Sequence, residues 1–179
     1  MKFIKRLFIG CVVAIVLLAG VGLLLPREIS VARSIVIDAP ASAVFPHVND
    51  LQATVDWSPW LARDPDTSLE FSADPVGEGA RMSWASDNPQ VGTGTMTITE
   101  SRPDDYVEVA LDFGDMGTAT ASWDFQEADG ATTATWSMQT DMGAGPVNRW
   151  FGVMMKRWIA DDYDAGLQNL KQLVEAKGG

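Results

Sequence analysis

The sequence predicts an α+β domain, in which one antiparallel sheet of seven strands packs on a long C-terminal helix and a single apolar helix precedes both. Six stretches between residues 68 and 139 alternate apolar and polar side chains, as strands with one solvated face do. Residues 146–175 repeat apolar side chains at helical spacing, and residues 7–25 carry no charge. A long apolar helix that follows a run of strands needs a sheet to lie on, so both parts belong to one layered domain.

Length and charge limit the classes of partner. The chain has 179 residues, which leaves one domain's length after the first 25. The formal net charge is −11, and residues 26–179 hold 10 basic and 24 acidic side chains. A domain of this balance is expected to be repelled by nucleic acid and by anionic lipid. We therefore expect no nucleic-acid partner.

The sequence offers few residues for metal or nucleophilic chemistry. Cys11 is the only cysteine and lies in the apolar N-terminal run, so the domain has no internal disulfide and no cysteine-based site. His47 is the only histidine, which excludes a histidine-rich metal site. We expect neither a metal nor a cofactor.

The N-terminal run predicts a membrane anchor. Residues 7–25 are long enough to cross a hydrocarbon core of ~30 Å. Lys2, Lys5 and Arg6 precede them, and this asymmetry places residues 1–6 in the cytoplasm and the domain on the far side. We predict an uncleaved signal anchor in the cytoplasmic (inner) membrane of a single-pass protein, followed by a linker at 26–29 and a domain at 30–177 on the periplasmic or extracytoplasmic side. A cleaved signal peptide is the alternative.

The domain should begin with one strand and two short helices. Residues 30–38 are rich in β-branched side chains and place Arg33 on the same face as three aliphatic residues. Residues 40–49 follow as a helix that Pro46 shortens or kinks. Residues 51–60 form a second short helical piece that ends in Trp57-Ser-Pro-Trp60. Two short helices cannot make a crossover of usual length, so a parallel doubly wound sheet is not expected.

Six strands and a long helix complete the domain. The alternating stretches lie at 68–71, 81–85, 91–100, 106–113, 118–126 and 133–139, with turn signals such as Asp129-Gly130 between them. Pro146 suits the first turn of the final helix. Its apolar residues are expected to form one continuous stripe made of Val147, Phe151, Met154, Trp158, Tyr163, Leu167, Leu170 and Val174.

The order of elements, together with several local motifs, resembles a known superfamily. The most specific motif is Arg33–Phe45 (RSIVIDAPASAVF), and weaker ones occur at 48–50, 57–60, 77–79, 91–94 and 130–136. On these the chain resembles the START-like (SRPBCC) superfamily over residues 30–177, and within it the bacterial polyketide cyclase/dehydrase-like proteins. The resemblance implies the helix-grip fold of START and Bet v 1-like proteins. It also implies an apolar cavity between the concave sheet and the long helix. Relatives include lipid and hormone binders, aromatic cyclases and oxygenase domains, so function is implied only as a class.

The cavity that this fold implies would be lined by aromatic and sulfur-containing side chains. Trp57, Trp60 and the turn at 114–117 are expected to close its mouth. The alternative is that the same bulky side chains fill the space as an ordinary core. The expected ligand-pocket residues are Trp57, Trp60, Met82, Trp84, Met96, Ile98, Leu111, Phe113, Trp123, Trp136, Met138, Phe151, Met154, Met155 and Trp158.

No catalytic residue can be assigned from the sequence. Ser58 has no histidine or lysine nearby, and the carboxylates at 161, 162 and 164 are typical of a solvated helix face. Asp56 and Arg63 flank the tryptophan motif and are candidates for the rim of an entrance. The leading hypothesis is a membrane-anchored, non-enzymatic domain that binds a small hydrophobic ligand or lipid. A cyclase/dehydratase-like enzyme and an envelope interaction module without ligand are the alternatives.

Overall fold

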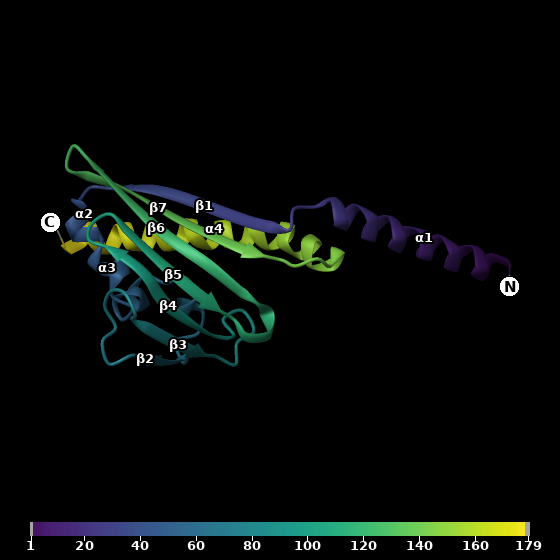
Figure 1. Ribbon diagram of the computed structural model, residues 1–179, viewed down its shortest axis with the longest axis horizontal. Helices are drawn as coiled ribbons and strands as arrows, with labels where there is room; N and C mark the ends of the chain where they lie inside the picture. Colours follow the sequence, from purple (N-terminus) through teal and green to yellow (C-terminus); the bar gives the residue numbers. More distant parts are fainter. Residues whose placement is uncertain (1, 178–179) are drawn as a thin grey trace.

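The structure, a computed structural model, describes residues 2–177. One apolar helix, a curved sheet and a long C-terminal helix follow one another (Figure 1). The elements are α1 (Lys2–Leu24), β1 (Glu28–Ile37), α2 (Ala41–Val44), α3 (Pro46–Asn49), η1 (Ala53–Asp56), η2 (Leu61–Arg63), β2 (Ser68–Phe71), β3 (Arg81–Ala85), β4 (Thr93–Arg102), β5 (Tyr106–Asp112), η3 (Gly114–Met116), β6 (Thr118–Ala128), β7 (Ala131–Asp141) and α4 (Pro146–Lys177).

The seven strands form one antiparallel sheet in the order β1-β7-β6-β5-β4-β3-β2. The predicted fold class is confirmed, with every predicted strand present. The register places Trp123 opposite Trp136 and Met82 opposite Met96, so the alternating apolar residues share one face. This inner face carries α4, while the threonine-rich outer face stays in solvent.

Local chemistry explains the breaks between elements. Pro46 has no N–H to donate, and the short helix after β1 divides there into α2 and α3. Between β6 and β7, Asp129 and Gly130 have φ of 54° and 81°, the paired positive values that a tight two-residue hairpin needs. The predicted kink and turn are therefore both confirmed.

The C-terminal half of α4 covers the inner face of the sheet. Its apolar side chains are almost fully buried: Tyr163 is 2% exposed, Leu167 1%, Leu170 0% and Val174 4%. They pack with residues from every long strand in one hydrophobic core. This half of the helix is the tightly held part of the grip.

The N-terminal half of α4 behaves differently, and the prediction of one continuous stripe is wrong. Val147 is 77% exposed, Phe151 49%, and Met154 and Trp158 are each 54% exposed. The reason is helical geometry: the step of five residues from Trp158 to Tyr163 turns the apolar face by about 140° at about 100° per residue. The helix therefore carries two apolar faces, and only the second one meets the sheet.

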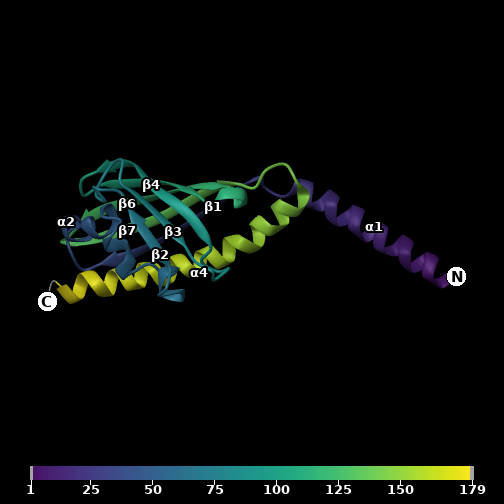
Figure 2. The same cartoon turned by 90° about the horizontal axis from the view of Figure 1, so that it is seen from below.

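Helix α1 runs outward from the domain and meets the start of α4 (Figure 2). It is long and apolar enough to cross a membrane, and nearly all of its side chains are exposed. Just after it, Arg27 pairs with Asp141 at the end of β7 at 2.5 Å and holds the pKa of that carboxyl at about 2. This pair ties the segment that follows α1 to the edge of the sheet.

Candidate functional site

The space between the sheet and the C-terminal half of α4 is occupied by packed aromatic rings. Trp57 makes edge contacts with Trp123 and Trp136, each with 5.4 Å between ring centroids. Trp136 in turn stacks on Trp123 at 4.6 Å and on Tyr163 at 3.8 Å. Ring pairs at these separations add stabilisation beyond the area they bury. At this end of the domain, the predicted pocket residues act as core.

Trp57 lies in the centre of that cluster and not at a mouth. It is 4% exposed, and its indole N–H donates to the carbonyl of His47 at 2.8 Å. The amide of Asn169 on α4 donates to the carbonyl of Trp57 at 3.2 Å. Because both polar groups of this residue have partners inside the domain, the chain turns inward after α3 and buries the indole. Of the other parts of the predicted mouth, Trp60 is half-buried and the turn at 114–117 is exposed.

Tyr163 is an inward-facing residue that the pocket prediction omitted. Burial raises the pKa of its phenol above the ordinary value of 10.0. The phenol therefore stays protonated at physiological pH and can serve as a hydrogen-bond donor but not as a base. The helical spacing of Tyr163, Leu167 and Leu170 was the signal that placed it inside.

The inner face is more open toward β3, β4 and β5. Met82 and Ile98 are 5% and 1% exposed, yet four neighbouring apolar side chains are only half-buried. We call these four the open apolar set; they are Trp84, Met96, Leu111 and Phe113. Helix α4 packs mainly along β1, at the opposite edge of the sheet, which leaves this set incompletely covered.

Trp84 is held in place by Gly94 on the neighbouring strand. The two residues face each other across β3 and β4. A Cβ atom on Gly94 would overlap the Trp84 indole and would come 2.7 Å from the carbonyl oxygen of Asp112. The indole N–H donates to the Val91 carbonyl at 3.3 Å, and the ring makes an edge contact with Phe113 at 5.9 Å. The glycine therefore makes room for a positioned aromatic side chain, a role that the sequence pattern did not reveal.

The helix side of the predicted pocket is not enclosed. Phe151, Met154 and Trp158 lie on the exposed face of α4, and only Met155 among the four predicted helix residues is half-buried. Ile159, which the prediction omitted, packs against the core. Met138 and Trp123, at 6% and 3% exposed, belong to the closed part of the inner face.

The acidic side chains of α4 form ion pairs with residues that sequence reasoning had treated separately. Arg33 on β1 reaches Asp164 at 3.2 Å, and Arg63 pairs with Asp162. These contacts join the helix to β1 and to η2. Within residues 2–177, no group of three or more histidine, cysteine or carboxylate side chains is placed to hold a metal ion. Asp56, the other rim candidate, is exposed.

Two hollows of this structure open on other surfaces. One of about 470 Å³ lies at the C-terminal end of α4 and includes His47, whose pKa is lowered by burial and by Lys177. The other, of about 720 Å³, follows the outer face of the sheet past Thr95, Thr97 and Thr120, and its lining also includes Leu111 of the open apolar set. Both linings mix polar and apolar residues, and neither contains a phenylalanine, tyrosine or tryptophan.

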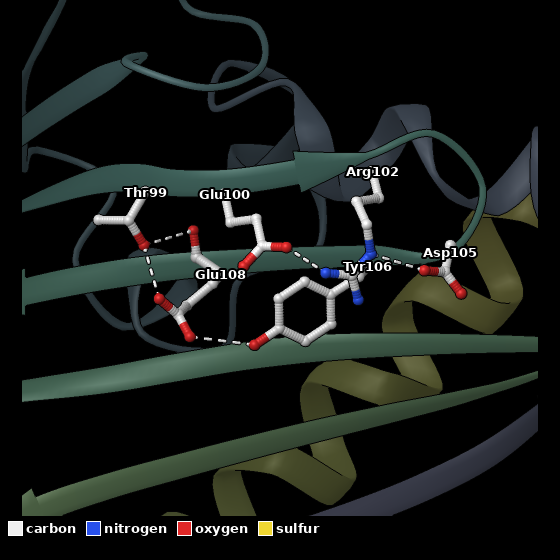
Figure 3. A network of polar contacts seen from close by, with 6 residues as sticks. All are labelled: Thr99, Glu100, Arg102, Asp105, Tyr106 and Glu108. Atoms are coloured by element: carbon white, nitrogen blue, oxygen red, sulfur yellow. Dashed lines mark hydrogen bonds and ion pairs between the residues drawn. The ribbon is translucent and has the colours of Figure 1, made fainter.

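The outer face also carries a polar network at the β4–β5 hairpin (Figure 3). Arg102 donates to Asp105 at 2.7 Å and stacks over the Tyr106 ring at 4.3 Å. The Tyr106 hydroxyl donates to Glu108 at 3.0 Å, and Thr99 donates to the same carboxylate at 3.0 Å. Burial and Glu108 raise the pKa of Tyr106. This network stabilises the hairpin on the face opposite the open apolar set.

Comparisons with known proteins agree with this fold. The sequence model of a family described as polyketide cyclase / dehydrase and lipid transport matches residues 28–175. No curated protein matches the chain.

Solved structures share the fold at low sequence identity. The chain is similar to a Staphylococcus aureus protein of unknown function, SA2116, with a TM-score of 0.64, 10% identity, and coverage of 84% of this chain and 96% of that one. The chain is also similar to protein Ms6760 from Mycobacterium smegmatis, with a TM-score of 0.57, 16% identity, and coverage of 83% of this chain and 92% of that one. For CalU16 from Micromonospora echinospora, the TM-score is 0.56 at 12% identity, and the match covers 81% of this chain and 75% of that one.

Proposed function

This chain belongs to the polyketide cyclase / dehydrase and lipid transport family, and from that premise we propose that it is a membrane-anchored domain that binds a hydrophobic ligand without transforming it. The ligand class is a lipid or another acyl or flat apolar molecule. Its binding surface is the open apolar set on β3, β4 and β5. Helix α1 is the anchor.

The observation that carries the proposal is the incomplete burial of the open apolar set. Four large apolar side chains stay half-buried on the inner face of β3, β4 and β5, next to the half-buried Leu69 and Phe71 of β2, whereas the inner positions 119–125 of β6 and 132–138 of β7 are buried. Covering apolar surface releases roughly 25 cal/mol per Å², so a ligand that completes this burial gains affinity from it. Aromatic and sulfur-containing side chains suit ligands of variable shape.

The position of this set also favours a lipid. The register pairs Glu28 with Asp141, Ala119 with Leu111, and Leu111 with Met96. These residues lie at the end of the sheet from which α1 leaves. A ligand that enters there would come from the bilayer side of the domain.

Native mass spectrometry on the full chain, released gently from detergent, tests the proposal. We expect a discrete added mass that is lost on denaturation. Leu111→Asp places a charge on the inner face and should abolish the added mass. Ala110→Asp is the matched control, because this neighbouring residue is exposed on the outer face of the same strand. A chain that carries no added mass, even after incubation with a lipid and aromatic panel, would contradict ligand binding.

One observation favours the enzymatic alternative enough to warrant a test. The protonated phenol of Tyr163 lies inside the fold and is suited to donating a proton or a hydrogen bond. Its close stacking on Trp136 supports a packing role instead. Tyr163→Phe keeps the ring and removes the hydroxyl, so unchanged ligand retention and turnover in this variant would argue against catalysis by this group.

A further inference from the structure

The exposed apolar face at the start of α4 is the feature that the proposed binding site does not explain. Its members are Val147, Trp150, Phe151, Met154 and Trp158, with exposed fractions between 36% and 77%. Contiguous exposed apolar surface of this kind marks a site of interaction. All of them except Trp150 lie on the side of the helix turned away from the sheet, so the domain itself does not cover them.

We infer that this face docks into the bilayer leaflet beside α1, so that residues 146–158 of α4 form a second, interfacial membrane contact. The inference rests on the membrane anchorage in the proposed function. It adds that the domain is held against the lipid surface and does not hang from a free linker.

Direct contacts between α1 and α4 set the depth of this face. The Trp150 indole N–H donates to the Leu18 carbonyl at 3.0 Å. Leu18 lies six residues before the end of α1, about 9 Å along the axis at about 1.5 Å per residue. If α1 crosses the bilayer, Trp150 therefore lies near the boundary between head groups and acyl chains, the position that tryptophan prefers.

The junction is built to keep the two helices together. Arg149 donates to the carbonyls of Leu23 at 2.6 Å and Leu25 at 3.2 Å, and so satisfies acceptors that the C-terminus of α1 leaves free. At Gly22, a Cβ atom would come 2.8 Å from the Pro146 Cβ atom and 3.0 Å from the Trp150 Cδ1 atom. A small residue at this crossing permits the close approach of the two helices.

The local charge fits a lipid head-group region. Residues 146–158 contain Arg149, Lys156 and Arg157 and no acidic residue, although the domain as a whole is strongly acidic. Basic side chains beside an apolar face with tryptophan are typical of helices that lie in the interface. The repulsion expected from net charge therefore does not apply to this segment, because the acidic side chains lie elsewhere.

Depth-dependent fluorescence quenching of the full chain in lipid nanodiscs tests the inference. An environment-sensitive label is attached at Phe151→Cys or Trp158→Cys in a Cys11→Ser background, and the nanodiscs contain phosphatidylcholine, phosphatidylglycerol and doxyl-labelled lipid. The matched control is Gln172→Cys, an exposed position on the distal half of the same helix. Residues 151, 158 and 172 are exposed on the surface of α4, so substitutions at these positions should preserve the fold.

An interfacial helix sits ~5–10 Å into the boundary, so we expect shallow doxyl groups to quench roughly half or more of the emission at 151 and 158. The label at 172 should not be quenched. Emission at 151 and 158 that matches position 172 would overturn the inference. A blue shift that depends on protein concentration and not on doxyl lipid would also overturn it, by assigning the face to a second copy of the chain.

The native thiol separates this inference from the anchor on which it rests. Cys11 lies midway along α1, so a label there should be quenched by doxyl groups deep in the acyl chains. Quenching at Cys11 without quenching at 151 and 158 would reject the docking of α4 and keep the anchor. No quenching at Cys11 would reject the anchor itself, and the docking with it.

Discussion

At the scale of single residues, tryptophans of this chain occur in two environments, the buried core and the exposed surface of α4. Trp57, Trp123 and Trp136 are 3–6% exposed and pack together in the core, whereas Trp158 is 54% exposed on the far side of α4. A tryptophan at a strand position next to a glycine, such as Trp84 opposite Gly94, is positioned by the lack of a side chain across from it. The function of each indole therefore follows from its neighbours and not from its type.

Trp136→Ala should be strongly destabilising, because Trp136 stacks on both Trp123 and Tyr163 and leaves a large cavity when truncated. We expect a loss of about 3–5 kcal/mol in the free energy of unfolding. Urea unfolding of the full chain in detergent, followed by circular dichroism of the sheet, measures it. Trp158→Ala is the control and should change stability by less than about 0.5 kcal/mol. Equal effects of the two substitutions would mean that the aromatic cluster is not the core.

At the scale of elements, α4 joins two different environments in one helix. Its second half fits the sheet, and its first half packs against α1 and, at the buried Gly152, against Ile29 of β1, while most of its large apolar side chains stay exposed. Because Trp158 and Tyr163 are five residues apart, the apolar face of the second half is rotated by about 140° from that of the first half. The ion pairs of Asp162 and Asp164 with Arg63 and Arg33 then hold the middle of the helix against η2 and β1.

Gly22→Leu should separate α1 from the start of α4. The added side chain overlaps Pro146 and Trp150, and overpacking of this kind costs about 1–3 kcal/mol. Hydrogen–deuterium exchange in nanodiscs should show faster exchange of the amides at 147–152. Gly20→Leu is the matched control, since nothing lies within 4 Å of a Cβ atom there. If Gly22→Leu exchanges like Gly20→Leu, the packing of the two helices is not what orders this segment.

At the scale of the whole molecule, α1 extends from the end of the domain at which α4 begins (Figure 1). The strand register places Leu111 and Met96 of the open apolar set in the row of residues that runs through Ala119 and Thr140 to Ile29, one residue from the start of β1. Under the proposed function, a ligand would have a short path from the bilayer to this set. A polar, acidic remainder keeps the rest of the domain in water.

The orientation across the membrane can be tested with a single thiol. In a Cys11→Ser background, Gln172→Cys places the thiol on the exposed distal end of α4. The basic residues before α1 predict an N-terminus in the cytoplasm. A membrane-impermeant maleimide should therefore label the protein in right-side-out vesicles and leave it unlabelled in inside-out vesicles. The reverse pattern would place the domain in the cytoplasm, and a shortened soluble protein would indicate a cleaved signal peptide.

Much of the fold was predictable because it depends on local periodicity. Alternation with a period of two predicted six strands, and β-branched residues predicted the first one. Pro46 and Asp129-Gly130 marked the kink and the hairpin that the structure contains. The uncharged run in α1 predicted a helix of membrane-spanning length by the same kind of local rule. The enclosed pocket stays a prediction. Some of its expected residues lie in the closed core, and others lie on an open face.

The sequence alone thus determined the elements, their order and the family, because backbone geometry and the need to bury alternating apolar residues act over a few neighbouring positions. Only the tertiary structure decided which apolar residues are covered. Trp57 is buried, and Phe151 and Trp158 are exposed, because coverage depends on which distant element lies opposite each side chain. The hydrogen bond from Trp150 to Leu18 likewise joins residues far apart in the chain, so local sequence patterns do not predict it.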